Sequence, residues 1–167
     1  IPTHFATSPT IRAIQYNDVL LGSNGTHPTG SGAPSYAYPE NVTFWALSLE
    51  PQNQGRLLWM KTITTVTPDN QNIQFQRAAE GVFVFVQTPT CKFIGYSMYT
   101  GEKLWETKPE SDFNPYGYYT WPSLITVEGT TIAYGKFFTS GYSGRVVCYD
   151  LYNGTLLWRY EAPTDMS

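Results

Sequence analysis

The sequence predicts an all-β protein built from three successive four-stranded antiparallel sheets. Composition supports this first, because 16% of the 167 residues are aromatic and only 14% are charged. Aromatic and β-branched side chains pack well on a pleated strand, and such a composition is typical neither of a disordered chain nor of a charged helical bundle. A repeat that runs through the chain supports it further, and no segment of comparable length shows helical periodicity.

Each copy of the repeat ends in a glycine followed four positions later by a tryptophan. The copies are GRLLW at 55–59, GEKLW at 101–105 and GTLLW at 154–158, each preceded by an apolar alternating run at 44–49, 93–98 or 146–151. The glycine allows the positive φ of a tight turn. We expect the residues two and four after it to share one face of the next strand, so that the tryptophan fills the gap between neighbouring sheets.

Two further strands precede each apolar run. The segments 13–23, 77–87 and 124–135 share one layout, in which an acidic turn at 17–18, 80–81 or 128–129 joins two short strands. Two-residue turns between alternating apolar runs are a strong hairpin signal. Four strands per unit, at a period of about 45 to 50 residues, are typical of a β-propeller blade.

The three predicted blades form a partial propeller. They cover about residues 9–60, 73–106 and 120–159 of a single segment, 1–167. Because closed propellers typically have four to eight blades, we expect further blades from a longer parent chain or from a second copy.

The repeat resembles that of the PQQ-like (quinoprotein dehydrogenase-type) propeller family. The family motif Ala-x-Asp-x-x-Thr-Gly-x-x-x-Trp is matched by GYSMYTGEKLW at 95–105 and CYDLYNGTLLW at 148–158, and by ALSLEPQNQGRLLW at 46–59 apart from an insertion. The resemblance covers essentially the whole chain. It implies that one set of residues docks each blade to its neighbour: Trp59, Trp105, Trp158, Gly55, Gly101 and Gly154.

The departures from the motif bear on function. Gly95 and Cys148 replace its alanine, and Ser48 and Ser97 replace its aspartate. The quinoprotein dehydrogenases of the family use an adjacent cysteine pair, whereas this chain has only Cys91 and Cys148. These two could pair in a disulfide or be two free, buried thiols.

The departures favour a non-catalytic binding or structural scaffold at the cell surface or outside the cell, with no cofactor. The alternatives are part of a PQQ-dependent quinoprotein oxidoreductase, holding the quinone or calcium, and a carbohydrate-binding module. No catalytic motif is present in the sequence, and His4 and His27 are isolated.

The net charge and the glycosylation sequons indicate which partners and which cellular location are plausible for the protein. The net charge of −3 and the scattered basic residues argue against nucleic-acid binding. No apolar run approaches the roughly 20 residues that span a bilayer. Three sequons, at Asn24, Asn41 and Asn153, are candidate glycosylation sites and favour an exported protein, although Asn-Gly is also a common turn dipeptide.

Two groups of loop residues form a candidate ligand surface for a protein or a glycan. Acidic residues recur in the connectors after the tryptophan strands, where they could bind calcium or cap their own backbone. The loop 112–121 is rich in aromatic residues, which would stack on a sugar or a protein if exposed, or wedge two blades together if buried. The candidates are Asp69, Asp112, Tyr116, Tyr118, Tyr119 and Trp121.

Overall fold

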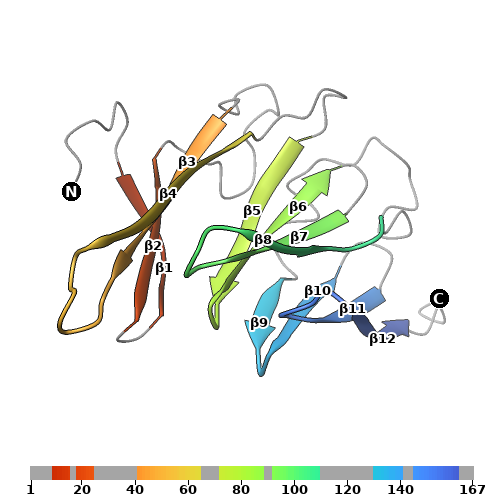
Figure 1. Ribbon diagram of the computed structural model, residues 1–167. Coiled ribbons are helices and arrows are strands. Elements are labelled where there is room, and N and C mark those ends of the chain that lie inside the picture. Colours follow the sequence, from red (N-terminus) through yellow and green to blue (C-terminus); the bar gives the residue numbers. More distant parts are fainter. Residues whose placement is uncertain are drawn as a thin grey trace.

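Three four-stranded antiparallel sheets fan out side by side in the computed structural model (Figure 1), so the predicted all-β fold of propeller blades is confirmed. The structure describes residues 9–15, 18–24, 41–64, 72–88, 92–109, 130–140 and 145–161. Blade 1 contains β1 (Pro9–Gln15), β2 (Val19–Asn24), β3 (Asn41–Ser48) and β4 (Leu57–Thr64); blade 2 contains β5 (Asn72–Ala79), β6 (Val82–Thr88), β7 (Lys92–Ser97) and β8 (Lys103–Glu106); blade 3 contains β9 (Thr131–Ala133), β10 (Lys136–Ser140), β11 (Arg145–Asp150) and β12 (Leu156–Glu161).

The strands of each blade lie in the order of the chain, from β1 to β4, from β5 to β8 and from β9 to β12. The first strands of neighbouring blades contact one another, β1 with β5 and β5 with β9, and the tryptophan strands form the opposite edges. Among the described residues, no helix has the length and apolar character needed to cross a membrane. The exact limits of the blades stay a prediction.

The core consists of two layers, one on each side of blade 2. Val82 and Val84 of β6 pack in the cluster shared with blade 3, whereas Phe83 and Phe85 pack in the cluster shared with blade 1. Successive side chains of a strand point to opposite faces. The continuous apolar run VFVFV therefore indicates a strand that is buried on both faces, as a middle blade requires.

The hairpin at the start of blade 3 corrects the sequence prediction. The expected turn at 128–129 lies outside the described residues, and 130–135 does not form one strand. Instead, β9 ends at Ala133 and the turn falls at Tyr134–Gly135, with φ values of 55° and 67°. The blade 2 turn at Glu80–Gly81, with φ values of 51° and 79°, is at the predicted place. Tyr-Gly is not among the dipeptides favoured for such turns, so sequence reasoning did not find this one.

A bulge in each blade corrects a second expectation. Trp59 pairs with Ala46 while Leu57 pairs with Leu47, which is a register shift. The same shift occurs beside Trp105 and Trp158. Because each bulge inserts one extra residue, the positions two and four after the glycine lie on opposite faces of the sheet. The tryptophan faces the following blade and the residue two positions before it faces the preceding one.

Candidate functional site: inter-blade contacts and the turn-end rim

The turn before each tryptophan strand has the same backbone geometry in all three blades. The glycine at its end has a positive φ of 82°, 70° or 72°, a conformation that side chains with a Cβ rarely adopt. Its N–H donates to the last residue of the preceding strand; the bonds are Gly55 to Ser48 (2.8 Å), Gly101 to Ser97 (2.9 Å) and Gly154 to Asp150 (3.0 Å). The insertion in blade 1 therefore leaves this turn unchanged at both ends.

Each tryptophan with a following blade lies over that blade's turn glycine. The indole Nε1 of Trp59 donates to the carbonyl of Met98 at 2.8 Å, and a Cβ on Gly101 would lie 2.6 Å from the ring. Trp105 repeats the contact with the carbonyl of Leu151 at 2.6 Å and with Gly154, whose Cβ would lie 2.7 Å from the ring. Only glycine leaves room for the indole here. The same residue also has the positive φ that the turn requires, so glycine is needed at this position for two reasons.

The departures from the family motif also have a structural reason. The residue paired with each tryptophan is small: Ala46 under Trp59, Gly95 under Trp105 and Cys148 under Trp158. A Cβ on Gly95 would collide with the Trp105 ring. Cys148 is fully buried and free, and burial raises the pKa of its thiol. It is thus one of the two free thiols considered, while Cys91 lies outside the described residues.

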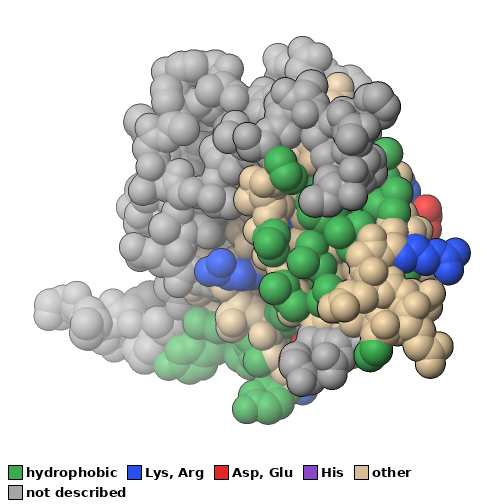
Figure 2. All heavy atoms as spheres, turned by 90° about the vertical axis from the view of Figure 1, so that its left-hand side faces the viewer, with side chains coloured by type: hydrophobic (Ala, Val, Ile, Leu, Met, Phe, Trp, Pro, Cys, Tyr) green, Lys and Arg blue, Asp and Glu red, His purple; other side chains and the backbone are tan. Residues whose placement is uncertain are grey.

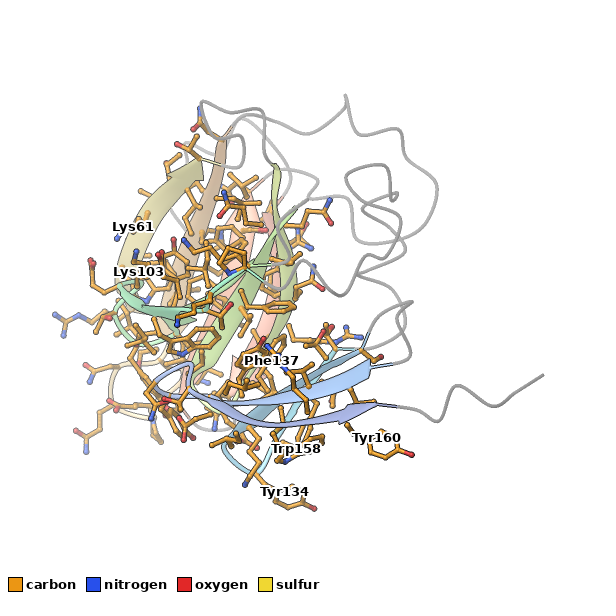
Figure 3. The ribbon with its side chains drawn as sticks, turned by 90° about the vertical axis from the view of Figure 1, so that its right-hand side faces the viewer. Lys61, Lys103, Tyr134, Phe137, Trp158 and Tyr160 are labelled. Carbon is orange, nitrogen blue, oxygen red and sulfur yellow. The ribbon has the colours of Figure 1, made fainter. Side chains whose placement is uncertain are left out.

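At the two ends of the three-blade array, the tryptophan of blade 3 and the turn glycine of blade 1 each lack the neighbour that completes this contact between the described blades. The Trp158 side chain is 44% exposed, against 6% for Trp105. At the other end, no described atom lies within 4 Å of a Cβ placed on Gly55. In Figure 3, Trp158 and Tyr160 project from one side of blade 3, while Phe137 lies on the side that faces blade 2.

The second candidate surface is the turn-end rim, which we define as the end of the blades that carries the hairpin turns. Three tyrosines are exposed there, Tyr99, Tyr134 and Tyr152; Tyr134 is the most exposed of them at 88%, and its ring points away from the sheets (Figure 3). Tyr99 and Tyr152 occupy the same turn position in their blades and lie against Gly81 and Gly135 of their own hairpins. The rim thus presents aromatic rings whose positions the turns hold.

Two hydrogen-bonded contacts join neighbouring blades along the rim. The Tyr99 hydroxyl donates to Asp18 Oδ2 at 2.7 Å, which raises the pKa of Tyr99 to about 12. The Glu80 carboxylate accepts the backbone N–H groups of Tyr134 and Gly135 at 2.9 and 2.7 Å. Each contact holds a rim tyrosine against the adjacent blade. Sequence reasoning missed these contacts, although it placed Asp18 and Glu80 in hairpin turns.

A shallow, open pocket lies on the rim between blades 1 and 2. The lengthened turn of blade 1 contributes Glu50 and Asn53 to it, Arg56 follows that turn, and Tyr99 contributes from blade 2. The other lining residues are Asp18, Val19, Ser48 and Leu58. The pocket carries charges of both signs and one aromatic ring, and of these the arginine and the tyrosine are residue types enriched at protein interfaces.

The predicted glycosylation sites differ in their surroundings. Asn24 is half-buried and accepts the indole N–H of Trp45 at 2.9 Å. Asn41 is exposed and accepts a bond from the Thr64 hydroxyl, and Asn153 is exposed and accepts the N–H of Thr155 at 2.8 Å. The turn thus gives the Asn-Gly dipeptide at 153 a structural role of its own, while glycosylation of the three sites stays a prediction.

The remaining predicted ligand residues lie outside the described residues: Asp69, Asp112, Tyr116, Tyr118, Tyr119 and Trp121. Within the described ranges, no three His, Cys, Asp or Glu side chains gather as metal ligands would.

The sequence of this chain is similar to that of a known protein family. Residues 19–167 match the family described as "Outer membrane protein assembly factor BamB". A 72-residue stretch, 42% of this chain and 18% of the relative, is 31% identical to the outer membrane protein assembly factor BamB of Kangiella koreensis (strain DSM 16069 / JCM 12317 / KCTC 12182 / SW-125).

Among solved structures, BamB from Moraxella catarrhalis is similar over 94% of this chain and 38% of that one, with 11% identity and a TM-score of 0.47. A europium-containing methanol dehydrogenase is similar over 71% of this chain and 21% of that one, with 21% identity and a TM-score of 0.41. The chain therefore spans well under half the length of the relatives it matches.

Proposed function

This chain belongs to the PQQ-like propeller repeat family described as outer membrane protein assembly factor BamB, and from that premise we propose that it is a protein-binding scaffold of the cell envelope. Its binding surface is the turn-end rim. The partner is a protein of outer membrane assembly, by analogy with the names of the matched family and relative. The observation that carries the proposal is the row of tyrosines on the rim, exposed but held in place by the turns.

The chemistry of the rim supports protein binding. Tyrosine is enriched at protein interfaces because a large rigid ring and a hydroxyl are presented together. Tyr134 is 88% exposed, and its backbone N–H is fixed by the Glu80 carboxylate. Because this backbone is already fixed, binding costs mainly the freedom of the two side-chain torsions of Tyr134, which is a small cost for so large a ring and favours affinity.

A crosslinking experiment in the source organism tests the proposal. A photoreactive phenylalanine derivative replaces Tyr134 on the rim or, as a control, Leu157, which is 45% exposed on the outer strand β12. We expect the Tyr134 position to crosslink to outer membrane proteins or their assembly partners, and the double variant Tyr134→Ala, Tyr152→Ala to lower the stability of that complex. Equal crosslinking from both positions, or none from Tyr134, would contradict the proposal.

A quinone titration separates this proposal from an oxidoreductase. A scaffold should give no saturable change in near-ultraviolet absorbance when pyrroloquinoline quinone is added to the purified chain. A saturable change would favour the oxidoreductase alternative and reject the scaffold.

A further inference from the structure

Hydrophobic side chains gather on the face of blade 1 shown in Figure 2, whereas three polar side chains are buried where blades 2 and 3 meet. They are Gln76 of blade 2 and Thr130 and Thr139 of blade 3, with exposed fractions of 7%, 6% and 1%. Gln76 Nε2 and the two threonine Oγ1 atoms have no hydrogen-bond partner in the described part of the chain. A buried polar atom without a partner costs free energy, so native proteins rarely leave one. We propose that an ordered water molecule bonds to these three atoms and bridges blades 2 and 3.

The position of Gln76 follows from a bulge in β5. The pairing of β5 with β6 shifts between Phe75 and Arg77, so Gln76 is the extra residue. Arg12 has the same place in a bulge of β1, and its guanidinium lies over the Phe75 ring of the following blade, 5.6 Å from the ring centre. We therefore expect the Gln76 side chain to reach towards its own following blade, blade 3.

The two bulge residues differ in what their own blade offers them. Arg12 Nε donates to Ser23 Oγ at 2.8 Å. The equivalent position in blade 2 is Val86, because Ser23 and Val86 each lie four residues after the first residue of the second strand of their blade. A valine side chain accepts no hydrogen bond. The Gln76 amide therefore lacks, at this position of blade 2, the side-chain partner that Arg12 has in blade 1.

Thr139 lies beside the bulge of β5 on the blade 3 side. It is two residues after Phe137, which packs in the cluster shared with blade 2, so both side chains point towards blade 2. Its equivalent in blade 2 is Phe85, because each lies four residues after the glycine of its hairpin turn. Phe85 packs edge-on against Phe75, the ring that the bulge residue of blade 1 covers. By the repeat, Thr139 is therefore a neighbour of Gln76.

The register of β9 brings Thr130 to the same place. Thr131 pairs with Phe138 on β10, so Thr130 stands opposite Thr139 one step further along the two chains. The Thr130 carbonyl also accepts a bond from Arg77 Nε at 2.9 Å, and that arginine directly follows the bulge residue. The bulge of β5 and the two threonines therefore meet at one place between the blades.

A water molecule matches the hydrogen-bonding groups at this place. The amide nitrogen of Gln76 only donates, whereas each threonine hydroxyl both donates and accepts. A water that accepts from the amide and bonds to both hydroxyls makes three bonds, which is the usual number for a buried water. All three groups are uncharged, so they suit a neutral molecule. Thr139 also takes up less volume than Phe85, which leaves room here that an aromatic ring fills between blades 1 and 2.

A high-resolution crystal structure of the full-length protein tests the proposal directly. We expect one water within hydrogen-bonding distance, about 2.7–3.2 Å, of Gln76 Nε2 and of the Oγ1 atoms of Thr130 and Thr139. Density for no water at this place would overturn the proposal. So would a direct bond from the Gln76 amide to a threonine, because the three atoms would then need no bridge.

Thr139→Val gives a second test, in which a bound water and an unpaired hydroxyl predict opposite signs. If the water is present, the valine removes one of its bonds and should raise the equilibrium constant for unfolding by about fivefold. If the hydroxyl has no partner, the valine removes a buried polar group and should lower that constant, which would contradict the proposal. Thr107→Val is the matched control, because Thr107 is also buried and its Oγ1 accepts the N–H of Phe93 at 3.0 Å. It should destabilise the protein in both cases.

A double variant tests whether the residues share one partner. Gln76→Leu and Thr139→Val should each destabilise the full-length protein in urea unfolding. Their combination should change the unfolding constant by less than the product of the two single effects, because the first substitution already weakens the water that the second would affect. Single effects that simply multiply would mean that the two side chains do not share a water, and the bridge between blades 2 and 3 would be rejected.

Discussion

The tryptophan contact between blades makes a quantitative prediction about stability. In a single chain, Trp105→Ala should lower the free energy of unfolding by more than Trp158→Ala does. The exposed fractions of 6% and 44% differ by 38% of the side chain. For a tryptophan that buries up to about 250 Å², this is about 95 Å² and, at about 25 cal/mol per Å², about 2.4 kcal/mol. The hydrogen bond from Trp105 to Leu151 adds about 1 kcal/mol, so we expect a difference of about 3 kcal/mol.

Guanidinium unfolding followed by circular dichroism measures this difference, at a protein concentration where the mass is that of one chain. The denaturant dependence should be the same in both variants, so that the midpoints report stability. Trp105→Phe keeps an aromatic ring but removes the N–H donor, and it isolates the bond to the buried Leu151 carbonyl. Equal losses from Trp105→Ala and Trp158→Ala would refute the reasoning, because the following blade would then contribute nothing to the burial of the indole.

Three smaller effects follow from single contacts. Gly101→Ala should destabilise the chain more than Gly55→Ala in the same unfolding assay, because both strain a positive φ, by about 1–2 kcal/mol, but only Gly101 lies under an indole. Because the pKa of Tyr99 is raised from 10.0 to about 12, its contribution to stability should be complete below pH 10 and disappear towards pH 12; Tyr99→Phe should remove one tyrosine step near pH 12 from an absorbance titration. Glu80→Ala should speed amide hydrogen exchange at Tyr134 and Gly135, and unchanged exchange would contradict the bonds seen there.

The fold could be predicted because its signals are local. The alternating runs set the strands, and the glycines at 101 and 154 need no partner to show that a tight turn precedes each tryptophan strand. The period between the tryptophans then indicates the blade size. Each of these signals depends on neighbours within one hairpin, so a single sequence is enough to read them.

The failures come from features that another part of the chain controls. The Tyr134–Gly135 turn places a tyrosine at a φ of 55°, and that tyrosine's N–H is held by Glu80 of blade 2. A contact across 54 positions of the chain leaves no local trace. The bulges were missed for a related reason, since an extra residue within a strand keeps the apolar composition while it moves later side chains to the other face.

The candidate site was the least predictable part, because exposure depends on which blades are adjacent. Trp59, Trp105 and Trp158 have the same motif position, and sequence alone gives them one role. In the structure, the two with a following blade donate their N–H groups to its backbone, whereas Trp158 is exposed. The rim tyrosines Tyr99 and Tyr152 show the same dependence, because Tyr99 donates to Asp18 of another blade, whereas no aspartate of another blade accepts a bond from Tyr152 in the described part of the chain.

The inter-blade contact and the turn-end rim therefore differ in the kind of partner that each can bind. The inter-blade contact consists of the same groups in each blade, an indole over a turn glycine and a backbone carbonyl, so its partner must be another blade of the same kind. The rim is defined by its differences between blades: a turn at 50–54 that is three residues longer in blade 1, a hydrogen bond from a tyrosine to an aspartate in blade 2, and an exposed Tyr134 in blade 3. Repeated features complete a ring, and only the features that vary from blade to blade can distinguish one partner from another. The rim is therefore where substitutions should change the partner without changing the assembly of the blades.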